Sequence, residues 1–135
     1  MRKIWMGIFA VVASVCVILL VIQTKEKSEI KEKLNKADDI FQSNFSQLCN
    51  NLNEQETVET NEENIKLAYA CFSILNLTSF SESEAMNKVV HSLYDLSEKQ
   101  ALYAELKETV KKDLNKLSQN WQDEELLNKI IEEIN

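Results

Sequence analysis

The sequence feature that most limits the fold is a long uncharged segment near the N-terminus, which covers residues 4–22 and reads IWMGIFAVVASVCVILLVI. A helix over this segment is about 28 Å long at ~1.5 Å per residue, which matches the ~30 Å hydrocarbon core of a bilayer. Trp5 lies near one end of the segment, where an indole ring is commonly found at a membrane interface. The sequence therefore predicts a short basic N-terminus, residues 1–3, followed by a transmembrane anchor over residues 4–22.

A cleaved signal peptide is the main alternative, because it also combines a basic start with an apolar stretch. Cleavage requires small residues at the end of a shorter apolar region. This segment instead ends with Leu20, Val21 and Ile22, and Cys16 follows Val15 in a sequence unlike a lipoprotein signal. We therefore expect the segment to remain in the mature chain as an anchor.

The orientation of this anchor is less clearly specified. Two basic residues, Arg2 and Lys3, precede the segment, whereas five lysines lie between residues 25 and 36. The positive-inside rule taken literally favours a cytoplasmic C-terminal part, but a very short basic N-terminus is typical of an anchor whose head stays in the cytosol. We expect a single-pass protein of the cell membrane with the bulk of the chain outside the cytoplasm.

The remaining residues, 23–135, have the composition of one small helical domain. The whole chain contains 1 glycine and no proline, far fewer than the averages of about 7% and 5%. Few tight turns can form without these residues, so the fold class predicted is all-α, a bundle of about four to five helices. Residues 37–135 contain 19 acidic residues against 8 lysines, which argues against binding to nucleic acid.

The first helix after the anchor is predicted over residues 23–53, as a juxtamembrane segment that becomes the first bundle helix. Lysines and glutamates fill its first two turns, either as a solvated face or as a contact with lipid phosphates. Apolar residues then recur every three or four positions, which places them on one stripe of a helix. The stripe consists of Ile30, Leu34, Ala37, Phe41, Phe45, Leu48 and Leu52.

The helical pattern stops after this stripe, and residues 54–60 are predicted to form an acidic loop. Its glutamates either form a patch for a cation or a basic partner, or simply keep a solvated turn open. Thr60, followed three residues later by Glu63, matches a capping box and predicts that the next helix begins near residue 61. The acidic side chains in this region are Glu54, Glu56, Glu59, Glu62 and Glu63.

The second domain helix is predicted over residues 61–77 and is the most apolar part of the bundle. Apolar side chains occur around most of its circumference, which indicates a central helix covered by its neighbours; a surface that binds a partner helix is the alternative. Its apolar residues are Ile65, Leu67, Ala68, Tyr69, Ala70, Cys71, Phe72, Ile74, Leu75 and Leu77.

The rest of the chain is predicted to form three more helical segments. Ser81 and Ser97 are each followed three residues later by Glu or Gln, as in a capping box. We therefore expect one helix after Ser81, a turn or kink near residues 95–97, and a second helix over residues 98–117. Its inward-facing residues are predicted to be Leu102, Tyr103, Leu106, Val110, Leu114 and Leu117.

The last helix is predicted to start near Asp123 and to bury an apolar stripe. Trp121 comes just before it and is expected to pack back over the end of the bundle. The predicted stripe consists of Leu126, Leu127, Ile130, Ile131 and Ile134.

No residues point to catalysis, a cofactor or a metal. His91 is the only histidine, and metal or acid–base sites seldom use one histidine unless carboxylates converge on it. Glu84 lies two turns earlier, so a weak pairing is an alternative to a histidine that faces solvent or packs partly. Without glycines, phosphate-binding loops and nucleophile elbows are hard to build. The sequence predicts that the chain is not an enzyme.

The cysteines raise the question of a disulfide, and the anchor raises the question of a homodimer. A disulfide between Cys49 and Cys71 would suit an oxidising compartment, but their unequal distances from the turn favour two buried free thiols. Ala10 and Ser14 stand four residues apart and would let two anchors approach closely, so a homodimer through them is a further hypothesis.

Taken together, these patterns predict a protein that works by binding other proteins. The leading hypothesis is a single-pass membrane protein, with its anchor at residues 4–22 in the bilayer, that serves as an interaction, accessory or regulatory subunit of a membrane or envelope complex. The alternative is a sensory or ligand-binding bundle that signals through the juxtamembrane helix. The protein partner is not specified by the sequence.

Overall fold

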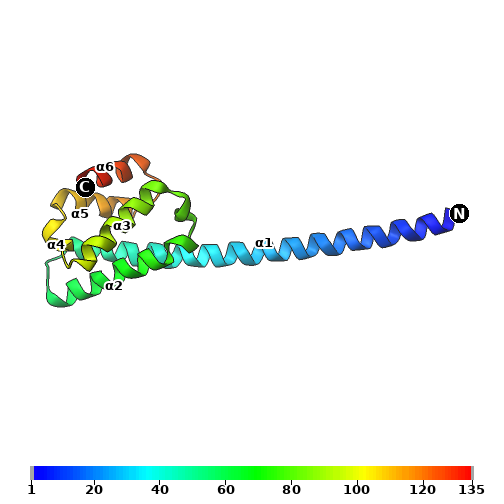
Figure 1. Cartoon of the computed structure of the whole chain (residues 1–135), viewed down its shortest axis with the longest axis horizontal. Helices are drawn as coiled ribbons and strands as arrows, with labels where there is room; N and C mark the ends of the chain where they lie inside the picture. Colours follow the sequence, from blue (N-terminus) through cyan, green and yellow to red (C-terminus); the bar gives the residue numbers. More distant parts are fainter. Residues whose placement is uncertain (1, 135) are drawn as a thin grey trace. The chain divides into compact units, whose positions relative to one another are not determined.

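The computed structural model describes the backbone of residues 2–134 and the side chains of residues 15–134. The described backbone contains α-helices, short 3-10 helices and turns, and no strand, which confirms the predicted all-α class (Figure 1). The elements are α1 (Arg2–Leu52), α2 (Val58–Ile74), η1 (Leu75–Leu77), η2 (Ser79–Glu82), α3 (Glu84–Glu98), α4 (Leu102–Glu105), α5 (Glu108–Leu117) and α6 (Glu124–Ile134).

The chain divides into two compact units, residues 1–34 and residues 35–135. Among the residues whose side chains are described, no helix carries an apolar stretch long enough to cross a membrane. The residues whose side chains are described therefore give no support to the predicted transmembrane helix. Residues 4–14 of that predicted anchor, including Ala10 and Ser14, lie outside the described side chains.

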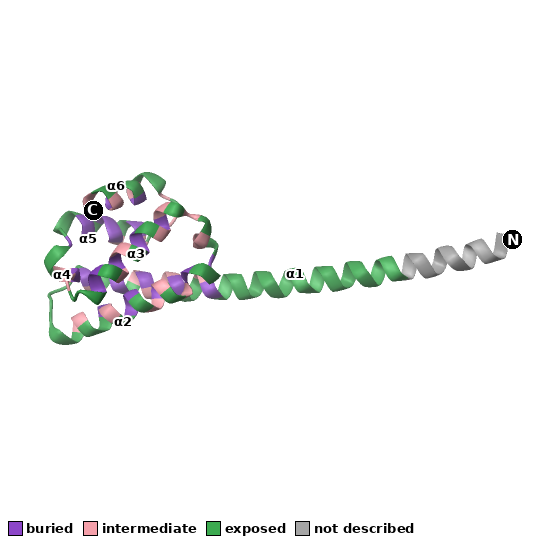
Figure 2. Ribbon diagram, in the orientation of Figure 1, coloured by how far each residue is buried: buried purple, intermediate pink, exposed green. Residues whose placement is uncertain are grey.

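The buried stripe of α1 begins later than the sequence predicts. Ile30 is 65% exposed and Leu34 is 36% exposed, although both share the apolar spacing of the core residues. Burial begins at Ala37 and continues through Phe41, Phe45, Leu48 and Leu52, while every described position before Ala37 is exposed (Figure 2). Helical spacing specifies which residues share a face, but the other helices decide where that face is covered.

The second helix begins three residues earlier than predicted, because Thr57 and Thr60 cap it instead of Thr60 and Glu63. The backbone N–H of Thr60 donates to the Thr57 hydroxyl at 3.1 Å, and the backbone N–H of Thr57 donates to the Thr60 hydroxyl at 2.8 Å. This reciprocal pair satisfies two N–H groups at the start of α2. The predicted box of Thr60 and Glu63 is therefore wrong, since Thr60 occupies the third helical position rather than the cap.

The segment between α2 and α3 consists of η1 and η2, and it is fastened to α1. The Asp38 carboxylate accepts hydrogen bonds from the backbone N–H and the hydroxyl of Ser79, each at 2.7 Å. The cap of α3 is Ser83, whose hydroxyl accepts the Met86 N–H at 3.2 Å. The predicted cap at Ser81 is thus two residues too early, because η2 occupies that position.

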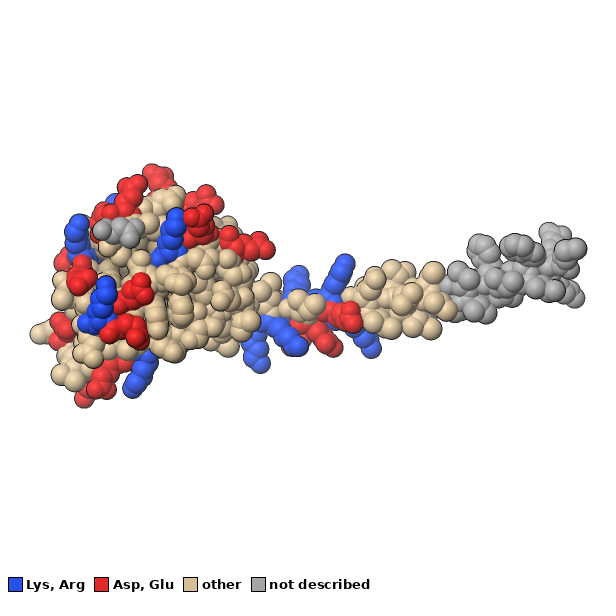
Figure 3. All heavy atoms as spheres, viewed as in Figure 1, with Lys and Arg blue, Asp and Glu red and all other residues tan. Residues whose placement is uncertain are grey.

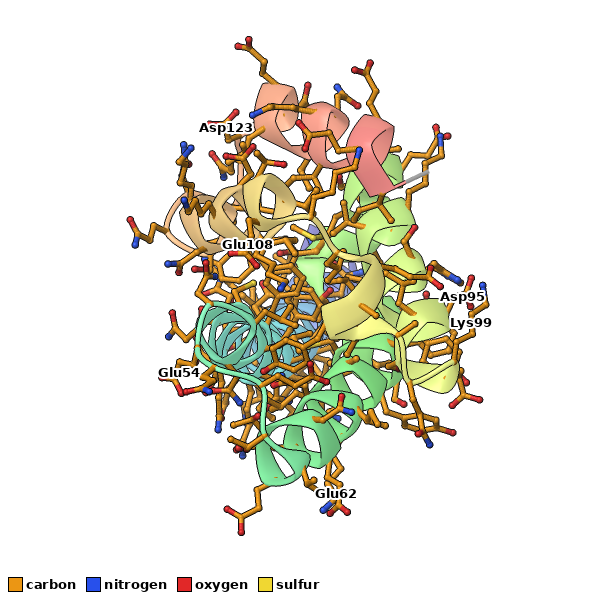
Figure 4. The ribbon with its side chains drawn as sticks, turned by 90° about the vertical axis from the view of Figure 1, so that its left-hand side faces the viewer. Glu54, Glu62, Asp95, Lys99, Glu108 and Asp123 are labelled. Atoms are coloured by element: carbon orange, nitrogen blue, oxygen red, sulfur yellow. The ribbon has the colours of Figure 1, made fainter. Side chains whose placement is uncertain are left out.

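The prediction that the 61–77 helix is central is wrong. The helix α3 packs against both α2 and α6, and it buries Met86, Val89, Val90, Leu93, Leu96 and Ser97. Figures 1 and 4 both place α2 on one side of the bundle and α6 on the other. In α2, Tyr69 is 53% exposed, and Leu77 just beyond its end is 66% exposed. The broad apolar character of α2 therefore reflects partly exposed side chains rather than burial on every face.

The predicted helix over residues 98–117 is interrupted twice. The helix α3 continues to Glu98, past the predicted turn at residues 95–97, and Gln100 then adopts a positive φ of 53°. The second interruption is at Leu106, where the backbone is extended, with φ −76° and ψ 117°. This ends α4 before α5 begins. Leu102, Leu106 and Val110 are all buried, so their spacing alone could not reveal the break.

The last part of the chain follows the prediction closely. The Asp123 carboxylate accepts the Leu126 N–H at 3.0 Å, and α6 begins at the next residue, Glu124. Trp121 packs against Phe41, Phe45 and Phe80 at ring-centroid distances of 6.1, 5.4 and 5.7 Å. The expected packing of Trp121 over the bundle is confirmed, and α6 buries Leu127 and Ile130 most fully.

Candidate interaction surface

His91 and Glu84 do not form the pair considered from the sequence. The Glu84 carboxylate instead binds the Lys88 ammonium at 2.7 Å, and this hydrogen bond and charge lower the pKa of Glu84. The exposed His91 ring packs edge-on against Phe72, with ring centroids 4.8 Å apart. Within the described part of the chain, no group of His, Cys, Asp and Glu side chains could hold a metal ion.

The two cysteines of the bundle are buried free thiols. Burial raises the pKa of Cys71 to about 12, and burial followed by the neighbouring Cys71 raises the pKa of Cys49 well above its ordinary value. Both thiols therefore stay protonated near neutral pH and are poor nucleophiles. This agrees with the free-thiol alternative rather than the disulfide.

A polar cluster lies where α1, α2 and α4 meet. The Asn64 amide donates to the Tyr103 hydroxyl at 2.9 Å, and that hydroxyl donates to the backbone carbonyl of Asn51 at 2.9 Å. Amide atoms of Asn51, Asn61 and Asn64 have no partner among the described groups, and they are sealed from solvent. A ligand on the surface cannot contact sealed atoms, so this cluster joins three helices and is not a binding site.

The acidic residues around the α1–α2 turn do not converge on one point. Figure 4 shows Glu54 and Glu62 pointing outward on different sides of the bundle. Glu63 accepts a hydrogen bond from the Gln47 amide at 2.6 Å. Glu56 and Glu62 do line an open depression of about 510 Å³, together with Thr57, Val58, Asn61, Ile65 and Gln100. Because these carboxylates are spread apart, the arrangement resembles a solvated turn more than a cation site.

The most distinctive surface feature is a series of four rings on α2 and α3, which we call the aromatic surface. It consists of Tyr69 and Phe72 on α2, and His91 and Tyr94 on α3. Each helix contributes two rings three residues apart, so both rings of a pair lie on one face of their helix. The Tyr94 ring stacks on Phe72 at 4.2 Å with an interplanar angle of 16°, and it contacts Tyr69 at 5.5 Å. The four rings therefore form one continuous series that ends at His91.

This aromatic surface is partly open to solvent. Tyr69 is 53% exposed, His91 is exposed, and Phe72 and Tyr94 are half-buried. Figure 3 shows an area over α2 and α3 without charged side chains, bordered by charged ones. Partial desolvation raises the pKa of the Tyr94 phenol, and the charges of Glu98 and Asp95 raise it further, as does Tyr69. Carboxylates therefore influence the edge of this apolar area.

The aromatic surface was not predicted from the sequence. The apolar character of residues 61–77 favours a core position for Tyr69 and Phe72 over a surface that binds a partner helix, and His91 is predicted to face solvent or pack partly, with a weak pairing with Glu84 as the alternative. The available signal was the matching pair spacing in the two segments, with Tyr69 and Phe72 in one and His91 and Tyr94 in the other. That signal specifies two faces but does not predict that they meet.

Comparisons of this chain with protein-family models, with curated proteins and with solved structures found no match.

Proposed function

We propose that this protein is a single-pass, membrane-anchored helical bundle that serves as an interaction, accessory or regulatory subunit of a membrane or envelope complex. In this proposal the bundle binds another protein, and it needs no cofactor, metal or catalytic group. The observation that carries the proposal is the aromatic surface, because rigid rings that remain exposed are frequent in protein-binding sites.

The anchor part of the proposal is supported by the sequence of residues 4–22. This segment contains no charged residue over 19 positions, and only Gly7 and Ser14 interrupt its apolar character. A backbone in hydrocarbon must satisfy its own hydrogen bonds, and a helix does so. The described backbone is helical throughout α1, from Arg2 to Leu52. Inside a bilayer, this segment would hold the bundle near a membrane-bound partner.

Membrane fractionation of the full chain tests the anchor. The proposal expects the protein in the membrane pellet after alkaline carbonate extraction, and expects Ala13→Arg to release part of it. Residue 13 is the middle position of residues 4–22, and a charge near the bilayer centre costs about 2.5–3.5 kcal/mol on insertion scales. The matched control is Ile30→Arg, which places the same charge on an exposed residue of α1 outside residues 4–22. Recovery of the unmodified full chain in the soluble fraction would contradict the anchor.

The proposed location of the bundle is outside the cytoplasm. The native thiols Cys49 and Cys71 cannot report this location because both are buried. Gln119 is exposed in the turn between α5 and α6, so Gln119→Cys in a Cys16→Ser background supplies an accessible thiol. Labelling of intact cells by an impermeant maleimide is the expected result, whereas labelling only after lysis would place the bundle in the cytoplasm.

The sensory alternative is favoured by the continuity of α1, a single helix of 51 residues. Such a helix contributes to the bundle core through Phe41 and Phe45 and extends back to residues 23–36, so a shift of the bundle could be transmitted along it. A small-molecule screen of the purified full chain distinguishes the alternatives. Ligand-dependent thermal stabilisation would favour a sensor, and flat melting curves together with a defined protein complex would favour an accessory subunit.

A further inference from the structure

We propose that the aromatic surface binds a basic amphipathic helix, in which lysine or arginine side chains flank an apolar stripe on a partner protein. This inference deepens the proposed function by assigning its docking site and the chemistry of the partner. It rests on that function only in requiring a protein partner. Incorporation of the chain into nanodiscs reports on the anchor, and peptide binding to the incorporated chain reports on the docking site, so the failure of one can be told from the failure of the other.

The rings of the aromatic surface hold one another in fixed positions. Tyr94 is in contact with two other rings, Phe72 at 4.2 Å and Tyr69 at 5.5 Å, and Phe72 also holds His91 at 4.8 Å. Rings fixed by mutual packing lose little conformational entropy when a partner binds. The two ring pairs lie on neighbouring helices, α2 and α3, which pack directly against each other. An apolar stripe of one helix can rest on such a surface.

The surroundings of the aromatic surface are acidic. Glu98 follows Tyr94 by four residues on α3, so its exposed carboxylate lies on the same face of the helix as the ring at the centre of the series. Residues 37–135 as a whole carry 19 acidic residues against 8 lysines, which attracts basic partners at long range. The faces of tyrosine rings also attract lysine and arginine side chains directly. An acidic partner would meet repulsion from the same groups.

The described neighbours of the aromatic surface do not cover it. Tyr69 remains 53% exposed although it packs against Tyr94. Lys66 precedes Tyr69 by three residues and lies on the same side of α2. Its positive charge opposes a basic partner. Replacing Lys66 by an acidic residue should therefore strengthen binding, which is the opposite of the effect expected for the other substitutions.

The test uses the full chain in nanodiscs of phosphatidylcholine, a zwitterionic lipid that attracts basic peptides weakly. The probe is a synthetic helical peptide with leucines along one face and lysines along the other, and its acidic counterpart has glutamates in place of the lysines. Empty nanodiscs give the background for both peptides. We expect saturable binding of the basic peptide alone, and weaker binding as salt rises, because screening acts on exposed charges.

Substitutions then locate the site. Tyr69→Ala should weaken binding of the basic peptide about tenfold, since aromatic residues dominate binding at such surfaces. The matched control is Val58→Ala, which trims another exposed apolar side chain of α2, 78% exposed, and should leave binding unchanged. Glu98→Lys should weaken binding and Lys66→Glu should strengthen it, each by about threefold, as expected for charges at the rim of an interface.

Three results would overturn the inference. Equal binding of the acidic peptide would remove the charge argument. Equal affinity of the wild type and Tyr69→Ala would place the peptide elsewhere. Self-association of the full chain that is lost in Tyr69→Ala would show that a second copy, not a basic partner, covers the surface. Because Tyr69 is exposed, its alanine variant should keep the thermal midpoint of the wild type, and the paired charge variants repeat the test without altering any ring.

Discussion

Two groups of aromatic side chains in this bundle have similar ring spacings but different surroundings. The first, which we call the aromatic core cluster, consists of Phe41, Phe45, Phe80 and Trp121, and it joins α1, η2 and the turn before α6. The second is the aromatic surface on α2 and α3. Phe41 and Phe45 are 0% exposed, whereas Tyr69 is 53% exposed. Ring contacts alone therefore do not indicate a role; the role depends on whether other segments cover the rings.

The difference also concerns which parts of the chain are brought together. The aromatic core cluster connects residues as far apart in the sequence as Phe41 and Trp121, so it closes the bundle. The aromatic surface connects only α2 and α3, which pack directly against each other and both contribute buried residues to the core, among them Leu67 and Cys71 from α2 and Val90 from α3. Removing a ring from the first cluster should affect folding, and removing one from the second should affect binding.

The largest expected effect is on the aromatic core cluster. Phe45→Ala leaves a cavity beside the two rings that Phe45 contacts, Phe41 and Trp121, and should lower the free energy of unfolding by about 3–5 kcal/mol. The measurement is chemical denaturation of the full chain, followed by circular dichroism. A loss below about 1 kcal/mol would mean that this cluster does not close the bundle.

A second prediction concerns the two ion pairs of Asp113 on α5, one with Lys116 on the same helix and one with Lys129 on α6, the helix that follows Trp121. The buried Asp113 carboxylate accepts hydrogen bonds from Lys116, at 2.8 Å, and from Lys129, and these bonds lower the pKa of Asp113. Asp113→Asn should lower the free energy of unfolding by about 1–3 kcal/mol at pH 7, because the charged hydrogen bonds are lost.

The pH dependence of this effect has a definite sign. A carboxylate with a lowered pKa in the folded state stabilises the fold above its unfolded pKa of about 3.9, and this contribution is lost as the pH falls through the folded pKa. The difference in unfolding free energy between the wild type and Asp113→Asn should therefore shrink as the pH falls from about 5 to about 2. A difference that stays constant over this range would show that the ion pairs do not contribute.

A smaller effect is expected at the C-terminal end of α3, the helix that carries His91 and Tyr94. Gln100 has a φ of 53°, a conformation that glycine adopts without steric cost. Gln100→Gly should therefore raise the free energy of unfolding by up to about 1 kcal/mol, while Gln100→Ala, which keeps a Cβ atom, should not. Thermal denaturation of the two variants side by side tests this, and equal midpoints would argue against strain at Gln100.

The smallest stability effect is expected on the aromatic surface. Tyr69→Ala removes a half-exposed ring that contacts only one other ring, so the free energy of unfolding should change by less than about 1 kcal/mol. Chemical denaturation under the conditions used for Phe45→Ala compares the loss of unfolding free energy in the two variants directly. Losses of similar size in the two variants would remove the distinction between a structural and a binding cluster.

The sequence predicted the class of fold because helical spacing and the near absence of glycine and proline act locally. The spacing also placed Phe41, Phe45, Leu48 and Leu52 on one buried face, and it placed Trp121 at the end of the bundle. Helix ends were predicted less well, since Thr57 and Ser83 competed with Thr60 and Ser81 for the capping positions. The break at Leu106 was missed because the same leucine is buried in a continuous helix and in an interrupted one.

The candidate site could not be predicted because it depends on which faces remain uncovered. Tyr69 and Leu75 lie on the same apolar helical segment, yet Tyr69 is half exposed and Leu75 is 2% exposed. The packing of the other helices around the core that contains Leu75 separates the two cases. The sequence thus specified the apolar residues of the bundle but not the part of them left for a partner.

The most direct test of the account is photo-crosslinking in intact cells with benzoylphenylalanine in place of Tyr69, compared with the same substitution at Val58. The account predicts a membrane-associated adduct from position 69, with a crosslinked partner peptide rich in lysine or arginine, and no such adduct from position 58. Absence of any adduct at position 69, or the same adduct from both positions, would contradict the assignment of the aromatic surface as the docking site.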